Sequence, residues 1–215
     1  MAISLKKGQG VTLKKSDFDL SMVTIGLGWD IKEEKKGFLG GLFRKKEEDY
    51  DLDVVAFLCG VSGKIQDLGQ VDANNRVTLV GGDVIFFNSM RHRSGCVWLT
   101  GDNRTGTGDG DDEQIIVKLN ELPEVYHKIV FVVQVYGGQQ KGQNFGAVRN
   151  AFIRAVDNKG KEMARFDLSG GPAFAQYCSM LFAELVRESG GWKFNAIGSP
   201  DQSDSFVVWL KQYID

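Results

Sequence analysis

The sequence has few of the residues on which several classes of protein depend. It contains two histidines and three cysteines among 215 residues. The cysteines (Cys59, Cys96 and Cys178) are odd in number and widely spaced, so they do not form a disulfide framework. Neither His92 nor His127 lies in a recognisable Ser or Cys nucleophile motif. The sequence therefore offers no support for covalent or acid–base catalysis, and we expect a protein that is not an enzyme.

The sequence also lacks a long apolar run and an excess of positive charge. Its most apolar stretch, residues 129–136, is too short to span a bilayer and suits a buried strand. The N-terminus lacks the apolar region of a signal peptide. The formal net charge is −2 and the isoelectric point is about 5.8, so no global basic field would recruit nucleic acid or an anionic membrane. We expect a cytoplasmic protein, free or peripheral to the inner membrane, without direct nucleic-acid binding.

Proline is scarce, with three residues, whereas glycine is abundant, with 27. Short β-rich runs recur between Gly, Asp and Asn, a pattern typical of a sandwich or barrel rather than a helical bundle. The chain is long enough for one well-buried core, so we expect a single domain over residues 1–215. Strands are predicted around 11–14, 22–29, 53–58, 84–87, 96–100, 114–119, 129–136, 149–156, 162–168, 179–187 and 192–197.

Short helices are expected at two places. Residues 120–127 are typical of one or two helical turns, with Asn120 as a cap and Pro123 in the first turn. Near the C-terminus, four apolar side chains recur at helical spacing and predict a short amphipathic helix that packs on the core: Phe206, Trp209, Leu210 and Tyr213.

Residues 32–50 interrupt the strand pattern with a near-palindrome of charged residues around a central glycine pair. A symmetric hairpin would place Lys36 opposite Lys45, and like charges directly across a strand pair are destabilising. We therefore predict a charged, mobile insertion. The alternative is a tip that touches a partner or a membrane through the apolar side chains of residues 38–43.

The most informative stretch is the acidic, glycine-rich segment 100–113. Like charges crowded so closely repel one another, and a bound hard cation would relieve that repulsion. Ca²⁺ prefers six to eight oxygen ligands, and glycines let backbone carbonyls join the carboxylates. The alternative is a solvated acidic turn. The segment supplies five candidate metal ligands: Asp102, Asp109, Asp111, Asp112 and Glu113.

Two further elements strengthen the metal hypothesis. Asp51 and Asp53 open the predicted strand at 53–58, and residues two apart in a strand point to the same side. Asn88 ends the strand at 84–87 and offers an amide oxygen. Because strand ends meet at one rim of a sandwich, these side chains are candidates for the same site as the acidic segment.

Known metal and phosphate motifs do not fit this segment. If Asp102 is the first position of an EF-hand loop, Glu113 is the twelfth, but Arg104 and Gly106 occupy positions that need oxygen side chains. The segment lacks the P-loop lysine motif, and its charge would repel a naked phosphate. Phosphate would bind only through a metal ion, with Arg104 or Lys141 as a second contact.

The motifs, taken together, resemble the TerD-domain family of tellurium-resistance and stress proteins. The resemblance covers nearly the whole chain and rests on Gly26-Leu-Gly-Trp-Asp30, Asp51-Leu-Asp53, Ile85-Phe-Phe-Asn88, the block Gly101–Glu113, Asn144-Phe-Gly-x-Val-x-Asn150 and Trp192-Lys-Phe. It implies a mainly β fold, a two-sheet β-sandwich, that binds Ca²⁺, often two ions, and has no known enzyme activity. The charged insertion, added residues at 68–82 and the C-terminal helix suggest a diverged member.

On this basis we predict a calcium-binding scaffold or sensor in bacterial tellurite, phage and colicin resistance. Its expected partners are other tellurium-resistance proteins, including membrane-associated ones. The alternative is a metal-dependent nucleotide- or phosphate-binding protein or enzyme that uses the same acidic segment. The predicted metal ligands are Asp30, Asp51, Asp53, Asn88, Asp102, Asp109, Asp111, Asp112 and Glu113.

Overall fold

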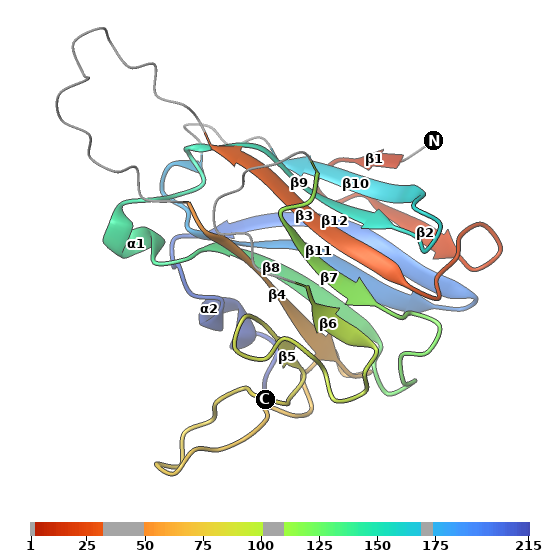
Figure 1. The fold of residues 1–215 in the computed structure, drawn as a ribbon, viewed down its shortest axis with the longest axis horizontal. Coiled ribbons are helices and arrows are strands. Elements are labelled where there is room, and N and C mark those ends of the chain that lie inside the picture. Colours follow the sequence, from red (N-terminus) through yellow and green to blue (C-terminus); the bar gives the residue numbers. More distant parts are fainter. Residues whose placement is uncertain (1–2, 32–49, 101–109, 169–173) are drawn as a thin grey trace, which may run out of the picture.

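The computed structural model describes residues 3–31, 50–100, 110–168 and 174–215, whose strands form two six-stranded sheets packed against each other (Figure 1). Neighbouring strands are antiparallel, except that β1 runs parallel to β10. Sheet A contains, in spatial order, β1 (Ile3–Leu5), β10 (Glu162–Leu168), β9 (Val148–Val156), β3 (Val23–Ile31), β7 (Glu113–Val117) and β6 (Val97–Leu99). Sheet B contains β2 (Gly10–Lys14), β12 (Gly191–Asp201), β11 (Ser179–Glu188), β8 (Lys128–Val135), β4 (Leu52–Cys59) and β5 (Val84–Ile85).

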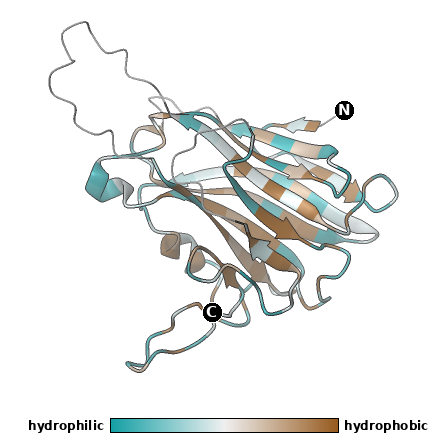
Figure 2. Ribbon diagram, in the orientation of Figure 1, coloured by the Kyte–Doolittle hydropathy of each residue, from teal (hydrophilic) through white to brown (hydrophobic). Residues whose placement is uncertain are grey.

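Sheet B is covered on both faces. Along β4, Leu52 and Val54 point into the main core between the sheets, because side chains alternate along a strand. Val55 and Phe57 point the other way, into a second apolar cluster on the outer face of sheet B. All eight residues of β4 are therefore buried, and β4 and β8 are predominantly hydrophobic (Figure 2), with Asp53 and Gln134 as buried polar exceptions.

The C-terminal segment covers the outer face of sheet B. It contains the short helix α2 (Val207–Leu210), and the buried Phe206, Trp209 and Leu210 belong to the outer cluster. The rings of Phe206 and Phe57 lie 6.2 Å apart between centroids. The predicted C-terminal helix and the packing of its apolar stripe are thus confirmed.

A long loop, residues 66–83, projects beyond β5 (Figure 1) and is anchored at its base by Asp83, whose side chain is fully buried. Burial alone would raise the pKa of Asp83, but hydrogen bonds outweigh it and hold the pKa below its ordinary value. The carboxylate accepts hydrogen bonds from four groups: the backbone amides of Gln66 and Asp67, the His92 ring and the Tyr126 hydroxyl.

The mainly β, two-sheet architecture confirms the predicted fold class, and all eleven predicted strands are present. The helix predicted at 120–127 is wrong, since this segment forms turns. The Tyr126 amide donates to the Pro123 carbonyl in a turn, and the Arg187 guanidinium donates to the Leu122, Pro123 and Tyr126 carbonyls, so side-chain bonds from β11 hold the turns in place. The strand β1 and the helix α1 (Gly138–Lys141) were not predicted. The charged insertion lies outside the described residues, except for Tyr50.

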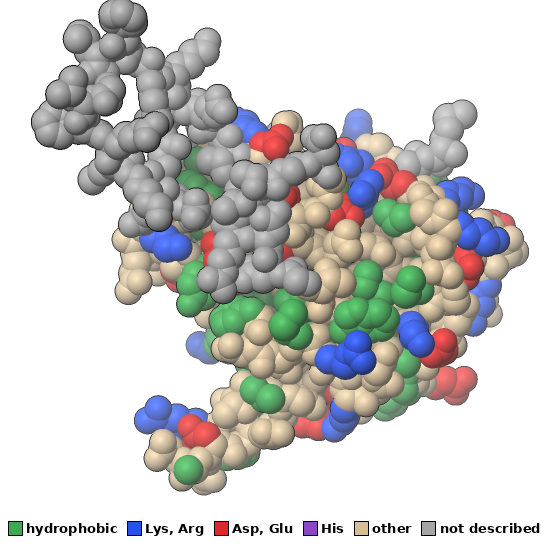
Figure 3. Space-filling model, viewed as in Figure 1, with side chains coloured by type: hydrophobic (Ala, Val, Ile, Leu, Met, Phe, Trp, Pro, Cys, Tyr) green, Lys and Arg blue, Asp and Glu red, His purple; other side chains and the backbone are tan. Residues whose placement is uncertain are grey.

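The described part of the face drawn in Figure 3 shows no field of one sign. In Figure 3, acidic and basic side chains are interspersed over the described part of one face. This agrees with the small net charge of −2. None of the helices in the described parts of the chain is long and apolar enough to cross a bilayer.

Candidate metal site

The end of the acidic segment lies along β3. The Asp112 amide donates to the Leu27 carbonyl at 2.8 Å, and the Trp29 amide donates to Asp112 Oδ2 at 2.9 Å. These bonds fix the backbone of residue 112 beside the strand. They also give the Asp112 carboxylate one defined orientation.

Two glycines of β3 make room for this arrangement. A Cβ at Gly26 would overlap the carboxyl group of Asp111, and a Cβ at Gly28 would overlap the Phe152 ring and the Gly110 carbonyl. The Gly-Leu-Gly spacing of the motif at 26–28 therefore has a steric cause. Larger residues here would push the acidic segment off the sheet.

Asp111 forms a buried ion pair on the outer face of sheet A. Its Oδ1 accepts from Arg154 Nε at 2.8 Å, its Oδ2 accepts from the Gln114 amide at 3.3 Å, and its side chain is 3% exposed. Arg154 also pairs with Glu162 at 3.1 Å. The hydrogen bond with Asp111 raises the pKa of Arg154. Both Asp111 oxygens thus have protein partners, which marks this residue as an anchor of the segment.

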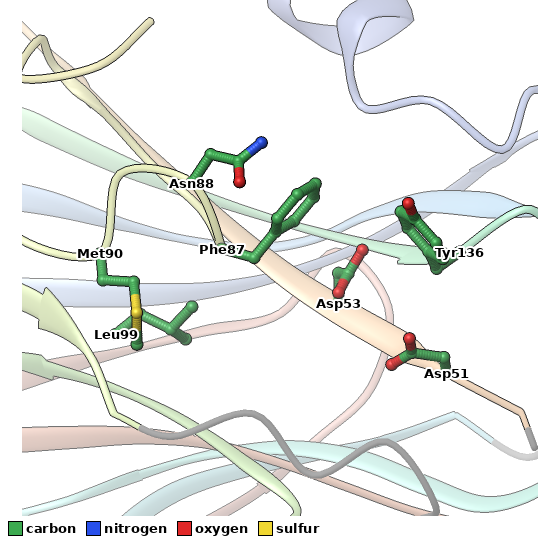
Figure 4. Close-up of a pocket in the computed structure, with 7 residues that line it drawn as sticks. All are labelled: Asp51, Asp53, Phe87, Asn88, Met90, Leu99 and Tyr136. Atoms are coloured by element: carbon green, nitrogen blue, oxygen red, sulfur yellow. The ribbon is translucent and has the colours of Figure 1, made fainter.

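A pocket of about 430 Å³ opens at the start of β4 (Figure 4). Asp51 and Asp53 line it together, so the prediction that they point to the same side is confirmed. Asn88, from the loop after β5, lines the same pocket. Its remaining walls are the apolar or aromatic side chains of Phe87, Met90, Leu99 and Tyr136. We call it the Asp53 pocket.

Two hydrogen bonds position the acidic groups around β4. Asp53 is 6% exposed, and its Oδ2 accepts from Gln134 Nε2 at 2.9 Å. Glu113 is 2% exposed, and its Oε2 accepts from the Val54 amide at 2.5 Å. Because β5 is too short to pair with Val54, the Glu113 carboxylate satisfies this amide and joins sheet A to sheet B.

A second pocket, of about 190 Å³, lies on the other side of the segment end. Asp30 and Asp112 line it together with the cationic side chain of Arg165, and Asn150 donates to Asp30 Oδ2 at 2.6 Å. Burial raises the pKa of Asp112, and the charges of Asp30 and Asp111 raise it further against the Trp29 hydrogen bond. We call this the Asp112 pocket. A cation there would relieve the repulsion among these carboxylates.

The structure thus distributes the described ligand candidates over two pockets and two anchoring contacts. Within the described ranges, no group of three or more His, Cys, Asp or Glu side chains is close enough to hold a metal ion. Asp102 and Asp109 lie outside the described residues, so the complete ligand set stays a prediction. The donors that are present are all oxygens, which fits Ca²⁺ and not a thiol- or imidazole-preferring metal.

Comparison with known proteins identifies the fold family. The TerD domain model matches residues 1–213. The chain belongs to the TerD family. It is 68% identical over 214 residues to tellurium resistance protein TerX of Serratia marcescens, with 100% of both chains covered. It is 38% identical to general stress protein 16U of Bacillus subtilis, over 93% of this chain and 91% of that one.

The predicted resemblance to the TerD family is therefore confirmed, and the function that the comparisons support is tellurium resistance and stress response. The fold of this TerD-family chain also matches the crystal structure of a homologue of telluride resistance protein (TerD) from Streptomyces coelicolor A3(2). That match has a TM-score of 0.59 at 19% identity and covers 87% of this chain and 94% of that one. At this identity the likeness shows the fold alone.

Two residues of the site were not predicted, Gln134 and Arg154. Gln134 lies within the most apolar strand, and its polar side chain in that context was the available signal. Arg154 alternates with apolar residues along β9, as any exposed strand residue would, so nothing in the sequence marks it as the Asp111 partner. Both contacts join segments far apart in sequence.

Proposed function

We propose that this TerD-family protein is a calcium-binding module that acts as a scaffold or sensor in tellurium resistance and stress response. The observation that carries the proposal is a pair of pockets, each lined by two carboxylates and an amide side chain. In the Asp53 pocket these are Asp51, Asp53 and Asn88, and in the Asp112 pocket they are Asp30, Asp112 and Asn150. Residues 110–113 line one pocket through Asp112 and contact the strand of the other through the bond from the Val54 amide to Glu113.

The proposal assigns one ion to each pocket. The described side chains provide fewer oxygens than the six to eight that Ca²⁺ requires, so the proposal expects Asp102, Asp109, backbone carbonyls and water to supply the rest. Glu113 and Asp111 would hold the segment in place from the two sheets. Calcium would tie β3, β4 and the acidic segment together, and its removal would loosen this end of the sandwich.

A calorimetric titration tests the proposal. We expect two bound Ca²⁺ ions per chain, with Asp53→Asn and Asp112→Asn each removing one. Glu121→Gln, an exposed carboxylate outside both pockets, is the matched control and should keep both. At a free concentration of 100 Kd, each ion stabilises the fold by about 2.7 kcal/mol. For a chain of this size that raises Tm by roughly 5–10 °C per ion. If no calcium binding were detected and chelation left Tm unchanged, the proposal would be refuted.

The same titration separates the binding module from the phosphate-binding alternative. One observation bears on the alternative: Lys141 Nζ lies 5.6 Å from the ring centre of Tyr136, at the rim of the Asp53 pocket. A metal-dependent nucleotide site would bind ATP only with calcium present and would lose this binding in Lys141→Ala. We expect no ATP binding in either condition. We further propose that the partners are other tellurium-resistance proteins, including membrane-associated ones.

A further inference from the structure

A row of buried polar side chains crosses the outer face of sheet B beneath the C-terminal segment. Asp53 on β4 pairs in register with Gln134 on β8, and Gln134 pairs in register with Ser179 on β11. The three are between 0% and 6% exposed. The other buried side chains on this outer face of sheet B are apolar and form the outer cluster. Three buried polar side chains among them need hydrogen-bond partners.

Both ends of the Gln134 amide are used. Its Nε2 donates to Asp53 Oδ2 at 2.9 Å, and its Oε1 accepts from the Phe206 amide at 2.7 Å. Farther along the row, Trp209 Nε1 donates to Ser179 Oγ at 3.0 Å. Gln134 is thus a direct link between a carboxylate of the Asp53 pocket and Phe206, the N-cap residue of α2.

The amide of Gln134 has a fixed polarity, since one end donates and the other accepts. A cation that holds the Asp53 carboxylate in place keeps an acceptor in front of Nε2 and so orients Oε1 toward Phe206. When Asp53 moves, Gln134 either follows it or gives up that hydrogen bond. Because a buried amide without a partner costs free energy, the Phe206 anchor weakens as well.

We propose that Gln134 is a positioning residue that couples cation binding in the Asp53 pocket to docking of the C-terminal segment, residues 203–215. The inference rests on the proposed calcium function and adds a regulated element to it. The docked segment covers the outer apolar cluster, so loss of the cation makes that cluster easier to expose. By linkage, release of the segment weakens cation binding by the same factor.

Hydrogen exchange of the backbone amides of residues 206–213, with and without Ca²⁺, tests the coupling. In the unmodified chain we expect Ca²⁺ to slow exchange of these amides about tenfold, within the range of about 5- to 150-fold typical of coupled sites. In Gln134→Leu this calcium dependence should vanish, because neither hydrogen bond can form. The variant keeps every carboxylate of the Asp53 pocket, and its exchange is compared with that of the unmodified chain at calcium concentrations that saturate both sites in each protein.

Gln139→Leu is the matched control. The Gln139 side chain also bonds to the C-terminal region, donating to the Gln202 carbonyl at 3.1 Å, but it is exposed and has no contact with Asp53. This variant should keep the full calcium dependence. If Gln134→Leu does not fold, Gln134→Asn replaces it, since the side chain is one methylene too short to reach both partners.

The outcomes are distinguishable. Calcium binding without any calcium effect on residues 206–213 would overturn the coupling and leave the proposed function standing. An equal calcium effect in Gln134→Leu and the unmodified chain would overturn the role of Gln134. Absence of calcium binding in the unmodified chain would overturn both the proposed function and the inference. As the reciprocal test, Trp209→Ala should weaken calcium binding at one of the two sites.

Discussion

The contact between Gly26 and Asp111 makes a quantitative prediction. The backbone of Gly26 does not adopt a left-handed conformation, so alanine is compatible with it. An added methyl group would nevertheless overlap the Asp111 carboxyl group. In Gly26→Ala, Asp111 must therefore rotate away and lose its bond to Arg154 Nε, now 2.8 Å long.

The expected cost follows from the burial of this ion pair. Breaking a fully buried pair costs about 3–5 kcal/mol. Arg154 is 28% exposed and keeps Glu162 as a partner, which reduces the penalty. We expect a loss of about 2–3 kcal/mol in the free energy of unfolding. In a chain of 215 residues this lowers Tm by roughly 5–10 °C.

A double-mutant cycle isolates the cause. Urea unfolding followed by circular dichroism, with a chelator present, would compare Gly26→Ala in the original background and in Asp111→Ala. With Asp111 shortened the overlap disappears, so Gly26→Ala should be neutral or stabilising by about 0.5–1 kcal/mol. If the same 2–3 kcal/mol were lost in both backgrounds, the overlap with Asp111 would not be the reason for glycine at this position.

Three further predictions concern other parts of the fold. Because the native pKa of Asp83 is depressed, its ionised form contributes stability above about pH 4 that is lost as pH falls through the native pKa. In Asp83→Asn, the free energy of unfolding measured in urea should therefore fall less steeply between about pH 4 and lower pH. An unchanged pH dependence would contradict this role of Asp83. Trp209→Ala should lower the free energy of unfolding by about 3–5 kcal/mol, because it opens a cavity and removes the hydrogen bond to Ser179 on β11. A loss below about 1 kcal/mol in urea unfolding would argue against firm docking of the C-terminal segment. Burial raises the pKa of Cys59 to about 12 and also that of Cys178, and Cys96 is buried too. A thiol reagent at pH 8 should therefore label these three residues in urea and leave them unlabelled in the native protein, and fast labelling of the native protein would contradict their protection by burial.

The strands could be predicted because their signal is local. Alternating or continuous apolar runs between glycine-rich turns fix a strand whatever lies beside it, and the pairing of Asp51 with Asp53 on one side follows from the two-residue period of the strand. The C-terminal helix was predicted for the same reason. Its four apolar side chains repeat at helical spacing.

The parts that were missed depend on contacts distant in sequence. Residues 120–127 have the composition of a helix start, but Arg187 captures their carbonyls from another strand. Asp111 is predicted as a metal ligand from its acidic neighbours, and its ion pair with Arg154 on the outer face of sheet A could not be seen from the sequence. A sequence pattern gives the inventory of acidic groups. The fold decides which of them face one another.

The division of the acidic residues into two pockets is tested most directly by a crystal structure grown with Ca²⁺ and examined by anomalous scattering. We predict two ions, one contacting Asp51, Asp53 and Asn88 and the other contacting Asp30 and Asp112. We also predict further oxygen ligands from the segment that includes Asp102 and Asp109. Well-ordered pockets without an ion at saturating calcium, or ions bound only elsewhere on the surface, would contradict this prediction.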